Sequence, residues 1–459
     1  MDRFTASDIA YLKTVLTTAE EKFFDWLAQL DCRDVKISAI KDGSVVFPRE
    51  PLIRVEGPIG ICQLLETTLL NLVNFPSLIA TNAARMKLAA GKGKKLIEFG
   101  LRRAQGPDGG VSASKYAFVG GFEGTSNVLA GKLFGITVSG THAHSFVMSY
   151  SRLSELEDSP FKRQVLECRQ RLGHENTNEG ELAAFVAYAT SFPDAFIALV
   201  DTYDMLASGV KNFLAVAWAL YLTGHQPRGV RLDSGDLAYF SKQIREEFRR
   251  ADAIAGQKLF EGLSIVASND INEDVLLSLN REGHEIDVFG IGTHLVTCQK
   301  QPALGCVYKL VEVNGSPRIK VSQEAEKMVI PGRKEIFRLY GAEGHPLVDL
   351  MVRADEPAPQ EGSPILVRHP FVENKRANIR PTKVVRLLSE VFSGTPLEAV
   401  SLPQRLEAAR LRCQQQMAEL RSDHSREVNP APYKVSVSAS LYDYLKKVWS
   451  DEMPISELK

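Results

Sequence analysis

Residues 229–236 read Gly-Val-Arg-Leu-Asp-Ser-Gly-Asp, a short apolar segment that ends in charged residues and glycine, and the amphipathic segment 236–250 follows it. This pattern recurs between residues 95 and 295, with apolar segments at 96–97, 136–139, 195–200, 229–230, 263–267 and 286–289. Strands that alternate with helices predict a parallel sheet, which either closes into a barrel or stays open with helices on both faces. In both cases the carboxyl ends of the strands share one edge of the sheet.

The segments on either side of this region have a different pattern. Short β-like segments at 35–40, 44–47 and 52–56 precede a helical stretch, 61–90, that we expect to break near Pro76. Segments 307–313 and 318–322 flank Asn314-Gly315 and predict a hairpin, whereas 151–181 and 355–382 predict a surface excursion and a loop. We expect four parts: 1–60 in a flanking β-rich domain, 61–300 as the α/β domain, 301–400 as the return of the β-rich domain, and 401–459 as a C-terminal helical extension.

The composition excludes several classes of partner. The 459 residues include 55 basic and 56 acidic side chains, so the formal charge of −1 creates no long-range field that attracts nucleic acid or anionic lipid. The six cysteines form no C-x-x-C pair, which favours a reducing compartment over a disulfide framework or a zinc ribbon. The longest apolar run, 213–222, is half of the roughly 20 residues that span a bilayer. We expect a soluble cytosolic protein with no nucleic-acid or membrane partner.

Polar side chains collect where the apolar segments end. They suit a phosphorylated sugar and a carboxylate-bearing partner, because arginine binds carboxylate or phosphate through paired hydrogen bonds and aspartate can hold ribose hydroxyls or hydrated Mg²⁺. The turn 290–293, Gly-Ile-Gly-Thr, could grip a phosphate or be only a tight turn, and Arg231 with Asp236 could be only an ion pair and a helix N-cap. The candidates are Arg102, Arg103, Thr141, His142, His144, Ser145, Asp201, Arg231, Asp233, Asp236, Asn269, Asp270, Thr293 and His294.

Residues 140–145, Gly-Thr-His-Ala-His-Ser, place two histidines two positions apart after a predicted strand. They could be a zinc pair of a hydrolase, although such a site needs further ligands and only His294 is offered. His144 could instead be a nucleophile or a phosphate acceptor that Thr141 and Ser145 assist through hydrogen bonds. A pair of structural histidines is the third interpretation.

Taken together, the segments 98–110, 124–131, 140–144, 231–236 and 288–293 resemble nicotinate phosphoribosyltransferases, and the resemblance runs from about residue 30 to the end of the chain. It implies an α/β fold, an irregular (β/α) barrel of the type II phosphoribosyltransferase kind beside a β-rich domain. It also implies ATP-dependent synthesis of nicotinate mononucleotide from nicotinate and 5-phosphoribosyl 1-pyrophosphate, the first step of NAD synthesis from nicotinate. The implied cofactor is Mg²⁺ or Mn²⁺, ATP is the co-substrate, and the implied assembly is a homodimer.

The resemblance also implies roles for individual residues. His144 matches the histidine that ATP phosphorylates, whereas His142 falls at a variable position as a bystander, and the zinc interpretation loses ground. Asp201 and Asp233 match acidic positions in the sugar and base site and are, with His144, the implied catalytic residues. The metal ligands stay unassigned. Nicotinate is expected to be bound by Arg102, Thr141, Ser145 and Arg231, and the phosphoribose by Asn269, Asp270, Gly290, Gly292 and Thr293.

One family feature has no counterpart by this comparison of motifs. Family members begin with a longer N-terminal segment that contains a D-L-Y-Q-like motif, whose tyrosine stacks on nicotinate across a dimer interface, and residues 9–13, Ile-Ala-Tyr-Leu-Lys, lie too close to the β segments to match it. We therefore expect a shortened isoform, an incomplete gene product, or a stacking platform supplied in another way. A weakly active or inactive dimerisation partner is one alternative function. An enzyme for nicotinamide or quinolinate is another, although Arg102 and Arg103 favour a carboxylate over an amide.

Overall fold

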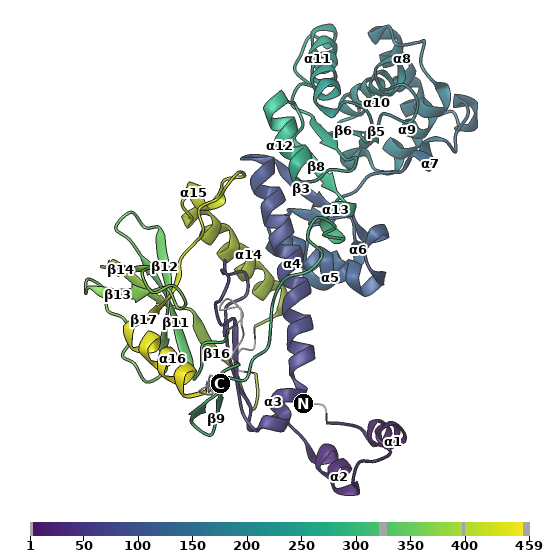
Figure 1. Ribbon diagram of the computed structural model, residues 1–459. Helices are drawn as coiled ribbons and strands as arrows, with labels where there is room; N and C mark the ends of the chain where they lie inside the picture. The colour runs from purple at the N-terminus through teal and green to yellow at the C-terminus, as the bar shows by residue number, and fades with distance from the viewer. Residues whose placement is uncertain (1–2, 321–327, 397–399, 453–459) are drawn as a thin grey trace, which may run out of the picture. The chain divides into compact units, whose positions relative to one another are not determined.

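The computed structural model describes residues 3–320, 328–396 and 400–452. The chain forms two compact units, one from residues 1–74 and 305–459 and the other from residues 75–304 (Figure 1). The division predicted from the sequence, with boundaries at 60, 300 and 400, stays a prediction. Each unit is described by itself below.

The unit of residues 75–304 is built on a six-stranded sheet in which each neighbouring pair of strands is parallel. The strand order is β4 (Gly124–Thr125), β3 (Lys95–Glu98), β8 (Val288–Ile291), β7 (Ser264–Ala267), β6 (Gly229–Leu232) and β5 (Ile197–Leu199). Beyond β4, Val138 forms a parallel bridge with Thr125 and extends the sheet. The predicted α/β class is confirmed, and the two-residue β4 is the strand that apolar periodicity could not reveal.

Helices follow these strands as the alternating pattern predicts. The helix predicted after residue 236 is α11, in which Asp236 is the N-cap and accepts a hydrogen bond from the Tyr239 N–H. Apolar side chains from the strands and from the helices form one buried core. The helices between Leu101 and Val296 are η1 (Leu101–Arg103), α5 (Gly106–Val119), α6 (Val128–Phe134), α7 (His144–Val147), η2 (Leu153–Glu155), α8 (Pro160–Leu172), α9 (Glu179–Ser191), η3 (Pro193–Ala195), η4 (Met205–Gly209), α10 (Val210–Leu222), α11 (Leu237–Ala255), α12 (Glu273–Glu282) and α13 (Thr293–Val296).

The prediction that 151–181 is a surface excursion is wrong. Helix α8 lies within this segment and buries Val165, Cys168 and Leu172 in the core. The helix was hard to recognise from the sequence because a charged residue, Arg169, occupies one of its buried positions, where an apolar residue would be expected. The Arg169 guanidinium donates hydrogen bonds of 3.0 and 2.7 Å to the backbone carbonyls of His174 and Glu175. A buried arginine that is satisfied by backbone carbonyls breaks the apolar periodicity of a helix without breaking the helix.

The most apolar long helix is Met205–Leu222, in which the π-helical η4 continues into α10. By length and composition alone this helix could cross a membrane, but 72% of it is buried inside the fold. It packs against α8 and α9. We therefore identify it as the core helix of this unit.

The second unit contains two larger sheets. The three-stranded sheet has the order β16 (Leu388–Ser393), β1 (Lys36–Ile40) and β2 (Ile53–Glu56), and both of its pairs are antiparallel. The six-stranded sheet has the order β14 (Arg376–Ile379), β13 (Ile365–Arg368), β17 (Val435–Ser438), β12 (Pro346–Arg353), β11 (Lys334–Tyr340) and β15 (Lys383–Arg386). The helices α1 (Ala6–Val15), α2 (Glu21–Gln29), α3 (Ile59–Leu64), α14 (Leu402–Glu419), α15 (Ser422–Ser425) and α16 (Ala439–Glu452) complete the unit.

Several local predictions differ from these elements. The loop predicted over 355–382 contains β13 and β14, whose short strands are paired across the proline-rich and charged segment. The hairpin around residue 314 is reduced to β9 (Glu312–Val313) and β10 (Ser316–Pro317), and residues 321–322 of its predicted second strand lie outside the described residues. The break near Pro76 does not occur, because α4 (Glu66–Ala90) continues through it and is held by the burial of Ile79, Ala83 and Met86.

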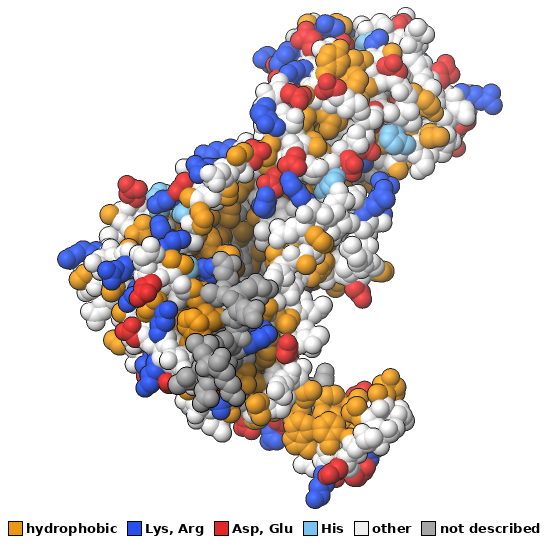
Figure 2. Space-filling view, in the orientation of Figure 1, with side chains coloured by type: hydrophobic (Ala, Val, Ile, Leu, Met, Phe, Trp, Pro, Cys, Tyr) orange, Lys and Arg blue, Asp and Glu red, His pale blue; other side chains and the backbone are white. Residues whose placement is uncertain are grey.

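The N-terminal helices expose apolar side chains. Helix α1 buries no residue, and Tyr11 and Val15 are 67% and 54% exposed, while Trp26 on α2 is 43% exposed. Figure 2 shows hydrophobic side chains gathered over these two helices, at the bottom of the view. Grouped apolar side chains of this kind on a surface are typical of a protein contact.

Candidate active site

The carboxyl ends of the parallel strands bring several predicted site residues into one hydrogen-bonded cluster. Arg231, in β6, donates from Nη1 to the Thr141 hydroxyl at 2.9 Å and from Nε to the Ser268 hydroxyl, after β7, at 2.7 Å. Its guanidinium lies 5.2 Å from the centre of the Phe99 ring, in the range of a cation–π contact. Burial lowers the pKa of Arg231, while the charges of Asp233 and Asp201 oppose that shift. Arg231 is therefore a half-buried cation held on three sides.

Two aspartates lie beside this arginine. Asp233 accepts a 2.7 Å hydrogen bond from Ser268 and lies 3.5 Å from Nη2 of Arg231. Asp201, just after β5, accepts from the Asp233 backbone N–H at 2.9 Å and from the Ser234 hydroxyl at 2.5 Å through Oδ2. The other oxygen of Asp201, Oδ1, is buried and forms no hydrogen bond. An unpaired carboxylate oxygen in a largely buried position favours a nearby cation or proton donor.

His144 faces these two carboxylates. Its Nδ1 lies 3.0 Å from the Thr202 hydroxyl, and its Nε2 lies 3.9 Å from Oδ1 of Asp201 and 3.9 Å from Oδ2 of Asp233. The imidazole stands at the start of α7 and is 40% exposed. The Nε2 atom therefore points towards negative charge in a position that solvent reaches.

The other predicted residues lie outside this hydrogen-bonded cluster. Arg102, Ser145, Asn269 and Asp270 are all exposed at the same strand ends. The charge of Arg102 contributes to the lowered pKa of Arg231, so the two arginines lie close enough to repel each other. Asp270 has a positive φ of 52° and lies 3.4 Å from the His294 imidazole. These exposed groups leave their side chains accessible to a ligand.

The segment Gly290-Ile-Gly-Thr293 is divided between a strand and a helix. Gly290 lies inside β8, where a Cβ atom would come within 2.4 Å of the Phe99 ring. Gly292 precedes α13, and a Cβ there would lie 3.0 Å from the Phe99 carbonyl oxygen. Both glycines therefore permit close packing against Phe99, while Thr293 begins α13 at the strand end.

Sequence reasoning missed four residues that organise this region. Ser268 joins Arg231 to Asp233, Thr202 contacts His144, and Phe99 lies under Arg231, as described above. The fourth is Glu98, a buried carboxylate that accepts hydrogen bonds from the hydroxyls of Ser114 at 2.8 Å and Thr125 at 2.5 Å. Glu98 thereby connects the segments 98–110 and 124–131. Thr202 carried a signal, since it directly follows Asp201, but Glu98 is recognised only through its burial.

A second buried carboxylate, Glu181, lies in α9 behind Asp201. Its Oε2 accepts from the Ser208 hydroxyl at 2.5 Å and from the Asn212 amide at 3.0 Å, and its Oε1 has no hydrogen-bond partner. Burial raises the pKa of Glu181 to about 7, and the charge of Asp201 adds to this rise. The folded protein therefore holds the proton of Glu181 more tightly than the unfolded chain does.

This raised pKa predicts a pH-dependent loss of stability. The contribution of protonated Glu181 is fully present below its unfolded pKa of about 4.3 and is lost as the pH rises through about 7. We expect Glu181→Gln to raise the melting temperature relative to the parent protein at pH 8 and to change it little at pH 4.5. Thermal unfolding across this pH range measures the effect. An equal change in melting temperature at both pH values would contradict the assignment.

The zinc interpretation finds no support among the described residues. Within residues 3–320, 328–396 and 400–452, no group of three or more His, Cys, Asp or Glu side chains is arranged to hold a metal ion. His142 and His144 point to different partners, since His142 bonds to the Leu199 backbone and His144 to Thr202. The two histidines therefore do not form a metal pair.

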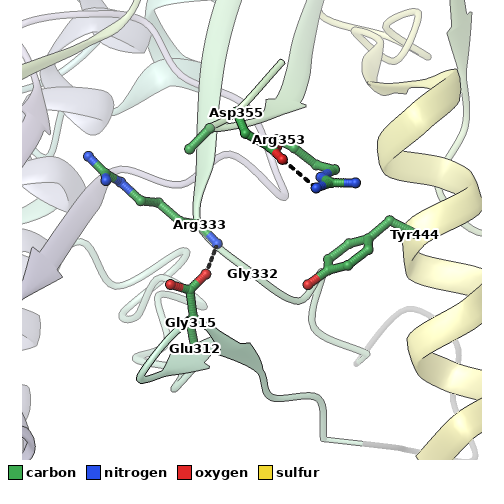
Figure 3. A pocket seen from close by; sticks show the side chains of 8 residues that line it. Glu312, Gly315, Gly332, Arg333, Arg353, Asp355 and Tyr444 are labelled. Atoms are coloured by element: carbon green, nitrogen blue, oxygen red, sulfur yellow. Dashed lines mark hydrogen bonds and ion pairs between the residues drawn. The ribbon is translucent and has the colours of Figure 1, made fainter.

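A pocket of about 330 Å³ in the other unit contains none of the predicted site residues. Figure 3 shows Arg353, Tyr444 and Glu312 around it. Its charges are largely satisfied locally, because Arg353 bonds to Asp355 at 2.5 Å and Glu312 accepts from the Arg333 N–H at 3.0 Å. We assign no role to this pocket.

Comparisons with known proteins point to the same family as the motifs at this site. The chain is 53% identical to nicotinate phosphoribosyltransferase of Dictyostelium discoideum, over 99% of this chain and 80% of that protein. It is 44% identical to the human protein of the same name, over 98% of this chain and 87% of the relative. The crystal structure of human nicotinic acid phosphoribosyltransferase superposes with a TM-score of 0.84 at 40% identity, covering 97% of this chain and 89% of that one.

Three family models also match the chain, and they correct one prediction. The model of the nicotinate phosphoribosyltransferase family matches residues 94–341, and that of its C-terminal domain matches residues 333–445. The model of its N-terminal domain matches residues 2–74, so the expectation that the family's N-terminal segment is absent is wrong. That expectation rested on one four-residue motif, whereas the family model matches the whole segment. The chain belongs to the nicotinate phosphoribosyltransferase family.

Proposed function

We propose that this protein transfers the phosphoribosyl group of 5-phosphoribosyl 1-pyrophosphate to the ring nitrogen of nicotinate, which yields nicotinate mononucleotide and pyrophosphate. The observation that carries this proposal is the cluster of Arg231, Asp233, Asp201 and His144 at one strand edge, in a chain of this family. A cation for a carboxylate substrate and anions for a cationic reaction centre occur side by side there.

Arg231 and Thr141 are the proposed nicotinate-binding residues, with Arg102 and Ser145 contributing from exposed positions. The hydroxyls of Thr141 and Ser268 hold the Arg231 guanidinium in place, so little side-chain entropy is lost when a carboxylate binds. Bond cleavage at C1 of the ribose develops positive charge, which the carboxylates of Asp201 and Asp233 would stabilise. The nicotinate nitrogen then attacks C1 while the pyrophosphate leaves.

The phosphoribose is proposed to lie over the ends of β7 and β8. Asn269 and Asp270 offer exposed polar side chains, and Gly292 with Thr293 offers backbone N–H groups and a hydroxyl at the start of α13. Gly290 contributes indirectly, since its missing side chain lets Phe99 approach the strand. Together these groups supply donors for phosphate and acceptors for ribose hydroxyls.

His144 is the proposed site of phosphorylation by ATP. Because Nδ1 contacts Thr202, Nε2 is the atom that would accept the γ-phosphoryl group, with ADP leaving and the Nε2 lone pair forming the new P–N bond. The negative charges of Asp201 and Asp233 would offset the positive charge of the imidazolium ring that forms, whose remaining N–H is the Nδ1–H that faces the Thr202 hydroxyl. Coupling to ATP would tighten substrate binding and drive the transfer forward.

A divalent cation, Mg²⁺ or Mn²⁺, is the proposed cofactor, and the donor set fits it. Mg²⁺ is commonly held by one or two carboxylates, water and substrate phosphates, and the unpaired Oδ1 of Asp201 beside Asp233 provides such carboxylates. When bound, the cation would neutralise the leaving pyrophosphate.

We also propose that the protein is a cytosolic homodimer. The exposed apolar side chains of α1 and α2 support a subunit contact, and the buried position of the Met205–Leu222 helix supports a soluble protein. Light scattering on the purified protein should give twice the mass of the 50.7 kDa chain.

The activity itself is tested with purified full-length protein, nicotinate, 5-phosphoribosyl 1-pyrophosphate, ATP and Mg²⁺. We expect nicotinate mononucleotide to form, with a higher rate in the presence of ATP. Nicotinamide and quinolinate serve as the competing substrates, and we expect neither to replace nicotinate. The absence of nicotinate mononucleotide under these conditions, or faster turnover of nicotinamide, would refute the proposal.

A further inference from the structure

His142 contacts β5, the strand at one edge of the parallel sheet. Its Nε2 accepts a hydrogen bond of 3.2 Å from the backbone N–H of Leu199, the last residue of β5. On its other side β5 pairs with β6, through the Val200 N–H and the Arg231 carbonyl oxygen at 3.0 Å. The imidazole therefore occupies the free side of β5, where a further strand would supply a carbonyl oxygen.

The opposite end of the sheet lies close to His142 in the sequence. Val138, four residues earlier, forms the parallel bridge with Thr125 that extends the sheet beyond β4. The segment from Val138 to His142 thus starts at the β4 edge of the sheet, and the side chain of His142 contacts the β5 edge. Here one side-chain acceptor takes the place of the backbone hydrogen bonds that a neighbouring strand would form with β5. The connection between the two edges of the sheet therefore depends on the His142 imidazole.

The surroundings of His142 keep Nε2 an acceptor. The ring is packed against Phe146, Phe185 and Tyr188 and is only 9% exposed. Burial lowers the pKa of His142 to about 4, and the nearby charges of Arg231 and His144 add to this shift. A neutral imidazole has one acceptor nitrogen, and because the Leu199 N–H can only donate, that acceptor is Nε2. The proton is then on Nδ1, which is buried and forms no hydrogen bond.

Both partners of this bond lie two residues before a proposed functional group. Leu199 lies two residues before Asp201, and His142 lies two residues before His144. The hydrogen bond between Leu199 and His142 therefore joins the two segments that carry Asp201 and His144. Further along these segments, Nε2 of His144 lies 3.9 Å from Oδ1 of Asp201. The same loop also holds Thr141, whose hydroxyl donates to the His142 carbonyl oxygen at 3.1 Å and accepts from Arg231.

We propose that His142 is a positioning residue that closes the sheet at the site and sets the distance between His144 and Asp201. This inference rests on the proposed function of His144. It replaces the expectation that His142 is a bystander. Loss of the acceptor would let the β5 end and the 140–144 loop separate, which moves Nε2 of His144 away from its carboxylate partners.

The test compares two amides at position 142 in the full-length protein. In His142→Gln the amide oxygen can reach the place of Nε2, whereas in His142→Asn the shorter side chain cannot. We expect His142→Asn to lower kcat by about tenfold, which is the effect of one lost hydrogen bond. The amount of phosphate bound to His144 after treatment with ATP should fall by the same factor. The KM for 5-phosphoribosyl 1-pyrophosphate should change little. His142→Gln should keep most of both signals.

A control variant at another histidine distinguishes a specific effect on the position of His144 from a general loss of stability. His174 is half-buried in this unit and its Nδ1 lies 3.3 Å from the Lys211 carbonyl oxygen, away from the strand ends. His174→Asn should lower the melting temperature without lowering the phosphate bound to His144. Equal phosphorylation in the Asn and Gln variants of His142, or an equal loss in His174→Asn, would overturn the proposal.

Hydrogen exchange tests the bond independently of activity. The Leu199 amide should exchange faster in His142→Asn than in His142→Gln, as followed by mass spectrometry of the peptide that contains β5. Unchanged exchange would refute the closure of the sheet by His142, even if the protein is active. Faster exchange in a protein that never forms nicotinate mononucleotide would support the closure and refute only the proposed function.

Discussion

Replacing Arg231 by alanine is expected to weaken nicotinate binding by about 1.5–3 kcal/mol, the range for a hydrogen bond to a charged group, which corresponds to roughly a 10- to 150-fold rise in the dissociation constant. The physical reason is that Arg231 is a cation held by Thr141, Ser268 and Phe99 in one orientation at the strand ends. Isothermal titration with nicotinate, in the presence of 5-phosphoribosyl 1-pyrophosphate, measures the effect.

Arg228 supplies the matched control for this experiment. It lies three residues earlier in the chain, at the opposite end of β6, and its Nε donates to the Asp194 carbonyl oxygen at 2.7 Å. Arg228→Ala should leave nicotinate affinity unchanged, because this side chain is exposed and remote from the strand ends that carry the site. Unchanged nicotinate affinity in Arg231→Ala would remove Arg231 from the site.

Replacing His144 by alanine is expected to abolish the stimulation by ATP, while a low rate of ATP-independent transfer survives. Nε2 of His144 is the proposed phosphate acceptor, and alanine has no atom that can take its place. Asp201 and Asp233 stay in position for the transfer itself, because Asp201 is held by the Asp233 N–H and the Ser234 hydroxyl. The ratio of initial rates with and without ATP should fall to about one, since only the coupled step is lost.

His225 is a control of similar exposure. Its side chain is 40% exposed, as that of His144 is, and it also faces a carboxylate, with Nδ1 at 3.2 Å from Asp194. His225→Ala should keep both the stimulation by ATP and the acid-labile phosphate that ATP leaves on the protein. Stimulation of His144→Ala as strong as that of the parent protein would show that His144 is not the phosphorylated residue.

The main features of the site could be predicted because parallel strands impose a strong geometric constraint. Once the βα alternation was recognised, every residue after an apolar segment was placed at one edge, and Arg231, Asp233, Asp201, Thr141 and His144 do meet there. Residues that act through burial were harder to recognise. Glu98 and Glu181 stand within segments of ordinary composition, and only their partners reveal that they are enclosed carboxylates.

The errors in the fold have a similar origin. Segment 151–181 resembled a solvated surface because it is charged, yet backbone carbonyls satisfy Arg169 and the helix buries its apolar face. Pro76 resembled a helix breaker, yet the burial of Ile79, Ala83 and Met86 keeps α4 continuous. In both places tertiary packing outweighed a local preference of one to a few kcal/mol.

The sequence by itself determined the α/β class and the edge at which the site lies, because strand order along the chain and the side-chain chemistry after each strand are local properties. Only the tertiary structure decided that Ser268 links Arg231 to Asp233 and that Glu98 joins β3 to β4. It also brought Nε2 of His142 to the backbone N–H of Leu199, the contact on which the proposed positioning role of His142 rests. These contacts join segments far apart in the chain, and their strength comes from burial, which no local pattern of residues records.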